Sequence, residues 1–142
     1  MSKKSEVKTI FLDTNVLIST ILYPFSTPFK AVLKSVSEPF IPYTSNVCIR
    51  ELENVFSHRF KDKHYLLDYF FESNIYLNII VVVTPIDKSE LETAIRDVKD
   101  RPILRAALAR DVDLFLTGDK DFLESGLTHP LPVSPREFLD NY

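Results

Sequence analysis

Four acidic residues, each beside an apolar segment, are the residues of this chain best suited to metal-dependent chemistry. Two of them come where an apolar, strand-like segment ends. Asp13 directly follows residues 7–12, and Asp119 follows residues 112–116 after a short Thr-Gly turn. Because parallel strands end at the same edge of a sheet, these two carboxylates are expected to lie side by side.

The other two acids occupy the apolar side of expected helices. Glu51 shares a helix face with Val47 and Val55, which lie four residues before and after it. Asp100 stands at the head of the apolar stripe of an Ala- and Leu-rich helix. A buried carboxylate without a partner is costly. These two positions therefore indicate a role beyond keeping the surface polar.

Each acid also has an ordinary structural interpretation. Asp13 could be a helix cap or a turn residue, and Asp119 could form an Asx turn. Glu51 could pair with Arg50 or with another base at the helix rim. Asp100 could cap the following helix, since the positive helix end favours an aspartate. A capping carboxylate can still offer a lone pair to a metal.

Taken together, the four acids favour a site for a hard cation. Several carboxylates in one cleft repel one another and raise each other's pKa unless a cation lies between them. Mg²⁺ and Mn²⁺ prefer oxygen ligands of this kind. Cys48 is the single cysteine, and no HExxH spacing occurs, so the familiar zinc patterns are excluded.

Apolar segments alternate between strand-like and helix-like lengths along the chain. The strand-like segments are continuous apolar runs, which indicate a parallel sheet covered on both faces. Residues 79–83 form the clearest buried strand of this pattern, and Thr27 with Pro28 is expected to open the second helix. The expected strands are 7–12, 39–43, 79–83, 112–116 and 131–133, and the expected helices are 16–22, 29–36, 46–60, 65–74, 89–95, 102–110, 121–125 and 135–141.

Length and composition favour a soluble, single-domain protein. We expect one domain over residues 1–142, with residues 1–6 as a flexible tail. The net charge of −3 counts mildly against a nucleic-acid binder. No leader-like segment opens the chain, and its longest aliphatic run is too short to span a bilayer. We therefore expect a cytoplasmic protein that does not contact membranes.

Three segments carry a resemblance to a known family: FLDTNVLIS, the glutamate of TSNVCIRELENVF, and RDVKDRPILRAALARDVDLFLTGDKDFL. They resemble PIN-domain nucleases, in particular the toxin components of toxin–antitoxin pairs, over about residues 8–139. By this resemblance the metal-binding acids are Asp13, Glu51, Asp100 and Asp119. The supporting positions are Asn15, Asp97, Thr117 and Asp121.

The resemblance implies a fold and an activity. The fold would be a three-layer α/β/α sandwich with a central parallel sheet of about five strands. The activity would be hydrolysis of RNA with Mg²⁺ or Mn²⁺, which leaves a 5′-phosphate and a 3′-hydroxyl. Asp119 or Asp100 would act as the general base. The family also implies a homodimer and an antitoxin partner.

Basic residues mark two candidate contacts with RNA. Residues 58–64 combine positive charge with an aromatic ring, a mixture typical of single-strand binders, although a solvated turn would look the same. The second group lies beside Asp100, where one arginine could instead pair with the nearby Asp97. The candidate residues are Arg59, Lys61, Lys63, Lys99 and Arg101, and Arg105 is a further one near the acids.

Two alternative functions remain open from the sequence. FLDTNV also resembles the first strand of haloacid dehalogenase-like phosphatases, but that family needs a second aspartate where Asn15 stands. Glu51 would have no use in such a phosphatase. The other alternative is a non-catalytic PIN fold that binds RNA or serves in assembly. The four intact acids argue against it.

Overall fold

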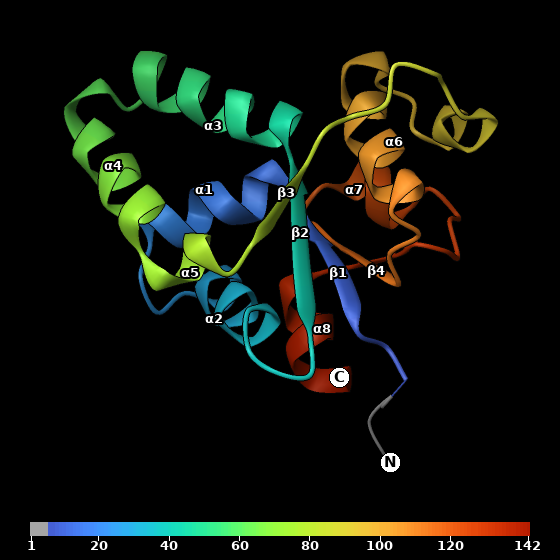
Figure 1. Ribbon diagram of the computed structural model, residues 1–142, viewed down its shortest axis with the longest axis horizontal. Coiled ribbons are helices and arrows are strands. Elements are labelled where there is room, and N and C mark those ends of the chain that lie inside the picture. The colour runs from blue at the N-terminus through green and yellow to red at the C-terminus, as the bar shows by residue number, and fades with distance from the viewer. Residues whose placement is uncertain (1–5) are drawn as a thin grey trace.

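The computed structural model describes residues 6–142 (Figure 1). The tail expected over residues 1–6 therefore lies, except for Glu6, outside the described residues. No single helix in the described chain is long and apolar enough to cross a membrane, and one pair of helices meets the length and composition criteria only with a bend of 113° between its members.

The core of the protein is one parallel sheet, as predicted. It has five strands in the order β3-β2-β1-β4-β5, and every neighbouring pair is parallel. The central strand, β1, is flanked by β2 and β4: the chain adds β2 and β3 on one side of β1 and then β4 and β5 on the other side. The strands are β1 (Thr9–Leu12), β2 (Ile41–Ser45), β3 (Ile80–Val82), β4 (Leu114–Leu116) and β5 (Leu131–Val133).

Helices cover both faces of the sheet and complete a three-layer α/β/α sandwich (Figure 1). One face carries α1 (Thr14–Leu22), α2 (Thr27–Ser35), α3 (Asn46–His58), α4 (His64–Glu72), α5 (Asn74–Leu77) and α8 (Pro135–Asn141). The other face carries α6 (Arg101–Ala109) and α7 (Lys120–Leu123). Short 3₁₀ helices η1 (Lys61–Lys63), η2 (Glu90–Ala94) and η3 (Val98–Asp100) join these elements.

Side chains of β1 divide between two cores because alternate residues of a strand point to opposite faces. Ile10 and Leu12 pack with the α1 side of the sheet, and Phe11 packs with the α6 side. The Phe11 ring stacks on Phe115 of β4, with ring centroids 5.3 Å apart. Phe115 in turn stacks on Phe122 of α7. The burial of all three β1 side chains explains why this strand reads as a continuous apolar run.

The strand β3 does not have the place that its sequence suggests. Residues 79–83 were expected to form the clearest buried strand, but β3 lies at the edge of the sheet. Ile80 is 43% exposed and Val81 is 40% exposed, whereas Val82 is buried. The expectation was wrong because an apolar run shows β propensity but carries no information about strand order.

Polar caps set the starts of several helices, with two corrections to the expected boundaries. α2 is capped by Ser26, whose hydroxyl accepts a hydrogen bond from Phe29 N, and not by Thr27. The helix expected over residues 65–74 ends at Glu72. Ser73 then caps the separate short helix α5 by accepting from Tyr76 N. Ser45 caps α3 and so fixes where that helix leaves β2.

Candidate functional site

The site is built at the carboxyl ends of β1 and β4, which are neighbours in the sheet. Leu12 pairs with Leu116, so the residues that follow, Asp13 and Thr117, lie side by side. Asp13 N donates to Leu116 O over 3.0 Å and extends the ladder by one residue. The Thr117 hydroxyl donates to Asp13 Oδ2 over 2.7 Å. The predicted juxtaposition of the two strand ends is thus present.

Asp13 is a buried carboxylate, with 4% of its surface exposed. Its Oδ1 accepts from Thr14 N over 2.8 Å, so the residue does cap α1. Burial raises the pKa of Asp13 to about 7, the hydrogen bonds from Thr117 and Thr14 oppose this rise, and the charges of Glu51 and Asp100 add to it. The cap and the candidate ligand are therefore the same side chain.

Asn15 links the two strand ends through its carboxamide. Its Nδ2 donates to Asp13 Oδ2 over 3.0 Å and to the Thr117 hydroxyl over 3.3 Å. Its Oδ1 accepts from Gly118 N over 3.0 Å. The Thr117 hydroxyl also accepts from Asp119 N. Asn15 and Thr117 thus hold Asp13 in one orientation and tie it to the loop that carries Asp119.

Glu51 reaches the same region from α3 and is half-buried. Its Oε1 accepts a hydrogen bond from the Thr14 hydroxyl over 3.0 Å. Burial raises the pKa of Glu51, and the hydrogen bond from Thr14 lowers it. The salt bridge with Arg50 considered from the sequence is absent between the described residues. Thr14 itself was missed as a functional residue, because nothing in the local pattern shows that α1 and α3 pack together.

Asp100 ends η3 and stands directly before α6. It occupies the N-cap position of that helix, but its side chain makes no capping hydrogen bond. The expected capping role is therefore wrong, since the backbone of Asp100 is already helical, whereas a residue that caps through its side chain usually has an extended backbone. Burial raises the pKa of Asp100 to about 6, and the charges of Asp97, Asp119, Glu51 and Asp121 raise it further.

Asp119, Asp121 and Asp97 each have a local partner. Asp119 caps α7 by accepting from Asp121 N over 2.9 Å, which is the Asx-type turn considered above. Asp121 forms an ion pair with Arg96 over 3.0 Å. Asp97 accepts from Lys99 N over 3.0 Å. All three are at the surface or partly exposed, and they surround the more buried carboxylates.

The four acids influence one another's charge without forming a closed coordination sphere. The charges of Glu51 and Asp100 raise the pKa of Asp13, and the charges of Asp119 and Glu51 raise the pKa of Asp100. Over residues 6–142, however, no three His, Cys, Asp or Glu side chains lie close enough to hold one metal ion. The donor set consists of carboxylate oxygens and fits Mg²⁺ or Mn²⁺. The carboxylates of the described residues therefore stand farther apart than the ligands of one bound metal ion.

The basic candidates divide into two groups. Arg59, Lys61 and Lys63 lie past the end of α3 (Figure 1), where Arg59 covers the Phe60 ring at 5.4 Å. Eight residues of helix separate Arg59 from Glu51, which is roughly 12 Å along the axis. The structure therefore does not bring this stretch to the acids.

The second group lies near Asp100 and has mostly structural contacts. Arg101 donates through Nε to Ile95 O over 2.8 Å and does not pair with Asp97. Arg105 forms a buried ion pair with Glu92 over 2.9 Å. It is 13% exposed and also binds a backbone carbonyl, so the suggested phosphate contact for Arg105 is wrong. Lys99 is exposed.

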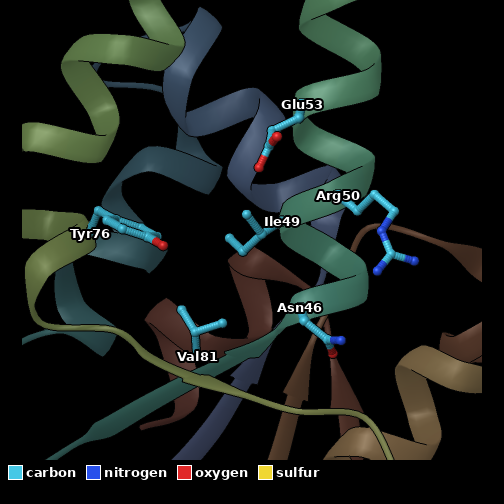
Figure 2. Close-up of a pocket in the computed structure, with 6 residues that line it drawn as sticks. All are labelled: Asn46, Ile49, Arg50, Glu53, Tyr76 and Val81. Carbon is cyan, nitrogen blue, oxygen red and sulfur yellow. The ribbon is translucent and has the colours of Figure 1, made fainter.

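A separate pocket of about 330 Å³ lies on the opposite side of α3, between this helix, α5 and β3. Figure 2 shows four of its lining side chains directed toward a common space, namely Tyr76, Glu53, Ile49 and Val81. Burial raises the pKa of Tyr76, and the charge of Glu53 raises it further. None of the four acids lines this pocket. Glu53 lines this pocket and therefore faces away from the site.

Comparison with known families identifies the fold. A family model described as "PIN domain" matches residues 9–121, a range that contains all four acids. The chain belongs to the PIN domain family. PIN domains are typically nucleases and commonly use divalent metals. No curated protein sequence matches the chain significantly.

A solved structure shows the same PIN architecture. The crystal structure of VapBC2 from Rickettsia felis bound to a DNA fragment from their promoter contains a similar chain, with a TM-score of 0.65 and 13% sequence identity. The alignment covers 89% of this chain and 98% of that chain. At this identity the likeness shows the fold alone. It is a structural match to a toxin–antitoxin complex.

Proposed function

We propose that this PIN domain is an endoribonuclease that uses Mg²⁺ or Mn²⁺ to hydrolyse RNA phosphodiester bonds. Its metal-binding acids would be Asp13, Glu51, Asp100 and Asp119. The observation that carries the proposal is the buried Asp13, whose pKa is raised by burial and by two further carboxylates. Carboxylates held together without a cation are destabilising, so their retention in a folded core supports a cation-binding role.

The chemistry divides among the residues of the site. A bound divalent cation would supply an activated water and stabilise the charge that develops on the phosphate. Asp13 is held rigid by Thr117 and Asn15 and would provide a fixed carboxylate. Asp100 makes no capping bond, and its pKa is raised to about 6 by burial and by Asp97. It is therefore suited to accept a proton near neutral pH.

We assign the general-base role to Asp100 in preference to Asp119, because the Asp119 carboxylate already accepts a backbone hydrogen bond in capping α7. Transfer of a water proton to Asp100 accompanies attack on phosphorus. The bond between phosphorus and the 3′ oxygen would then break, and the departing 3′ oxygen would take a proton from solvent water, which gives a 5′-phosphate and a 3′-hydroxyl. Lys99 lies one residue away and would contact a neighbouring phosphate, with Arg101 beside it. Arg59, Lys61 and Lys63 would contact RNA farther along the strand.

The decisive experiment compares variants of two acids of the site with a variant of Glu53, which lies on the opposite side of α3 from Glu51. Cleavage of a defined panel of RNAs is measured with Mn²⁺ for wild type, Asp13→Asn, Glu51→Gln and Glu53→Gln. We expect the first two variants to lose activity and Glu53→Gln to retain it, because Glu53 faces the separate pocket. Circular dichroism checks that each variant is folded. Wild-type rates in Asp13→Asn would refute the assignment of the site.

The fold also supports a biological role as the toxin of a toxin–antitoxin pair. The similar solved chain comes from VapBC2, and this likeness at low identity supports the role by analogy. We propose an antitoxin protein as a partner, together with a homodimer of this chain. Co-expression with the product of a neighbouring reading frame, followed by purification through one tag, tests the first. Light scattering of the purified protein tests the second.

A non-catalytic PIN module is the second candidate. It is favoured by one observation, that no three potential metal ligands of residues 6–142 lie within reach of one ion. RNA binding without cleavage, at Mn²⁺ concentrations that saturate the protein, would support this module. The family match favours either PIN function over the haloacid dehalogenase-like phosphatase.

A further inference from the structure

We infer that Thr14 is a positioning residue of the metal site: its hydroxyl orients Glu51 so that one carboxylate oxygen stays directed to a divalent cation shared with Asp13. The inference rests on the proposed function and deepens it. Thr14 would not bind the cation itself; its side chain would act through Glu51.

Thr14 touches both acids from one point of the fold. It is the first residue of α1, directly after the strand end, and is 5% exposed. Its backbone N donates to Asp13 Oδ1 over 2.8 Å, and its hydroxyl donates to Glu51 Oε1 over 3.0 Å. Thr14 thus joins the two acids, Asp13 through its backbone N–H and Glu51 of α3 through its hydroxyl.

This hydrogen bond decides which oxygen of Glu51 is available. Oε1 is occupied by the Thr14 hydroxyl, whereas Oε2 receives no hydrogen bond or ion pair from the described part of the chain. A free glutamate side chain loses rotamer freedom when it binds a cation. Holding Glu51 in place beforehand removes that loss from the binding step, as hydrogen-bonded outer partners do for metal ligands in general.

The other half of the site lacks such a restraint. Asp100 makes no capping hydrogen bond, and the Asp119 carboxylate accepts a hydrogen bond from Asp121 N, a backbone amide of its own turn. Thr14 therefore holds Glu51 in place beside Asp13 before any cation binds. Loss of the hydroxyl should weaken cation binding more than it disturbs the fold, because the backbone bond to Asp13 does not involve the side chain.

The test measures Mn²⁺ binding to the intact protein through the electron paramagnetic resonance signal of free Mn²⁺. Thr14→Val removes the hydroxyl and keeps the branched shape, and Thr14→Ala is a second hydroxyl-free variant. We expect both to raise the Mn²⁺ dissociation constant about tenfold or more, and Thr14→Ser to stay within about threefold of wild type. Cleavage should need correspondingly more Mn²⁺ in the hydroxyl-free variants.

Thr20→Val is the matched control on the same helix. Thr20 is 4% exposed, and its hydroxyl donates to Val16 O over 2.7 Å, remote from the acids. It should lower thermal stability without changing the Mn²⁺ dissociation constant. Hydroxyl-free Thr14 variants that bind Mn²⁺ as tightly as wild type would overturn the inference, as would Thr14→Ser weakened as much as Thr14→Ala. A wild type that binds no Mn²⁺ would overturn the proposed function together with this inference.

Discussion

The charge of Asp13 should make the metal-free protein less stable as the pH rises. Burial raises the pKa of this carboxyl to about 7 in the folded chain, against 3.8 for an exposed aspartate. Folding therefore favours the protonated form. The stability contributed by the neutral carboxyl is complete below pH 4, falls between pH 4 and 7, and is absent above pH 7. A shift of about three pKa units corresponds to about 4 kcal/mol of unfolding free energy.

Asp13→Asn removes this dependence. The amide cannot ionise, but its nitrogen meets donors from Thr117 and Asn15, which costs about 1–2 kcal/mol. The variant should therefore be about 2–3 kcal/mol more stable than wild type at pH 8 and about 1–2 kcal/mol less stable at pH 4. Urea unfolding of both proteins in the presence of a chelator, from pH 4 to pH 8, measures the difference in unfolding free energy at each pH. Added Mn²⁺ should stabilise wild type at pH 8 and leave Asp13→Asn unchanged.

Asp113→Asn provides a control of opposite sign. Burial raises the pKa of Asp113, but hydrogen bonds from the Thr9 backbone, the Lys8 backbone and the Thr9 hydroxyl outweigh it and hold the pKa below its usual value. Asp113→Asn should thus destabilise the protein at neutral pH, with an effect that shrinks in acid. The reasoning is refuted if metal-free wild type has the same stability at pH 5 and pH 8, or gains stability with rising pH.

Three further predictions follow from contacts elsewhere in the structure. Glu92→Gln leaves the 13%-exposed Arg105 without its charged partner and should lower the unfolding free energy by about 3 kcal/mol, which thermal and urea unfolding will show. Lys61→Ala combined with Lys63→Ala should weaken RNA binding and flatten its dependence on salt, measured by fluorescence anisotropy, while cleavage at saturating RNA is retained. Asp100→Asn should abolish the Mn²⁺-dependent step in single-turnover cleavage, whereas Asp97→Asn should retain most of the rate; the reverse order would exchange their roles.

The pattern of apolar segments predicted the sheet well because it depends on local sequence. Continuous runs such as residues 7–12 indicate strands that are buried on both faces, and parallel strands end at one edge of the sheet. That reasoning placed the strand ends that precede Asp13 and Asp119 side by side, and the 2.7 Å hydrogen bond from Thr117 to Asp13 confirms that these two strand ends meet. The five-stranded parallel sheet is confirmed as well.

The failures share one physical cause, which is dependence on tertiary placement. β3 has the composition of a buried strand, but it lies at the edge because the chain after β3 returns to the other side of β1 to form β4. The bond from Thr14 to Glu51 exists because α1 packs against α3. In the sequence, Arg105 has the charge expected of a residue that contacts phosphate. The fold brings Glu92, thirteen residues away, into an ion pair with it. The spacing of apolar residues along a helix does not show which other helix it packs against or which residue its charged side chains pair with.

Hydrogen bonds and a buried ion pair hold the segment between β3 and α6 against α6, which determines how this part of the protein unfolds locally. This segment has little regular structure, yet Glu92 binds Ser89 N and Arg105, and Arg105 reaches Pro85 O. Arg101 adds a bond to Ile95 O. Glu92 and Arg105 are both largely buried, so separating them would leave a buried charge unpaired, and the segment should open as one cooperative unit. Its hydrogen-bonded amides would then exchange with solvent deuterium at a common rate, and the placement of Asp100 would persist or fail together with them.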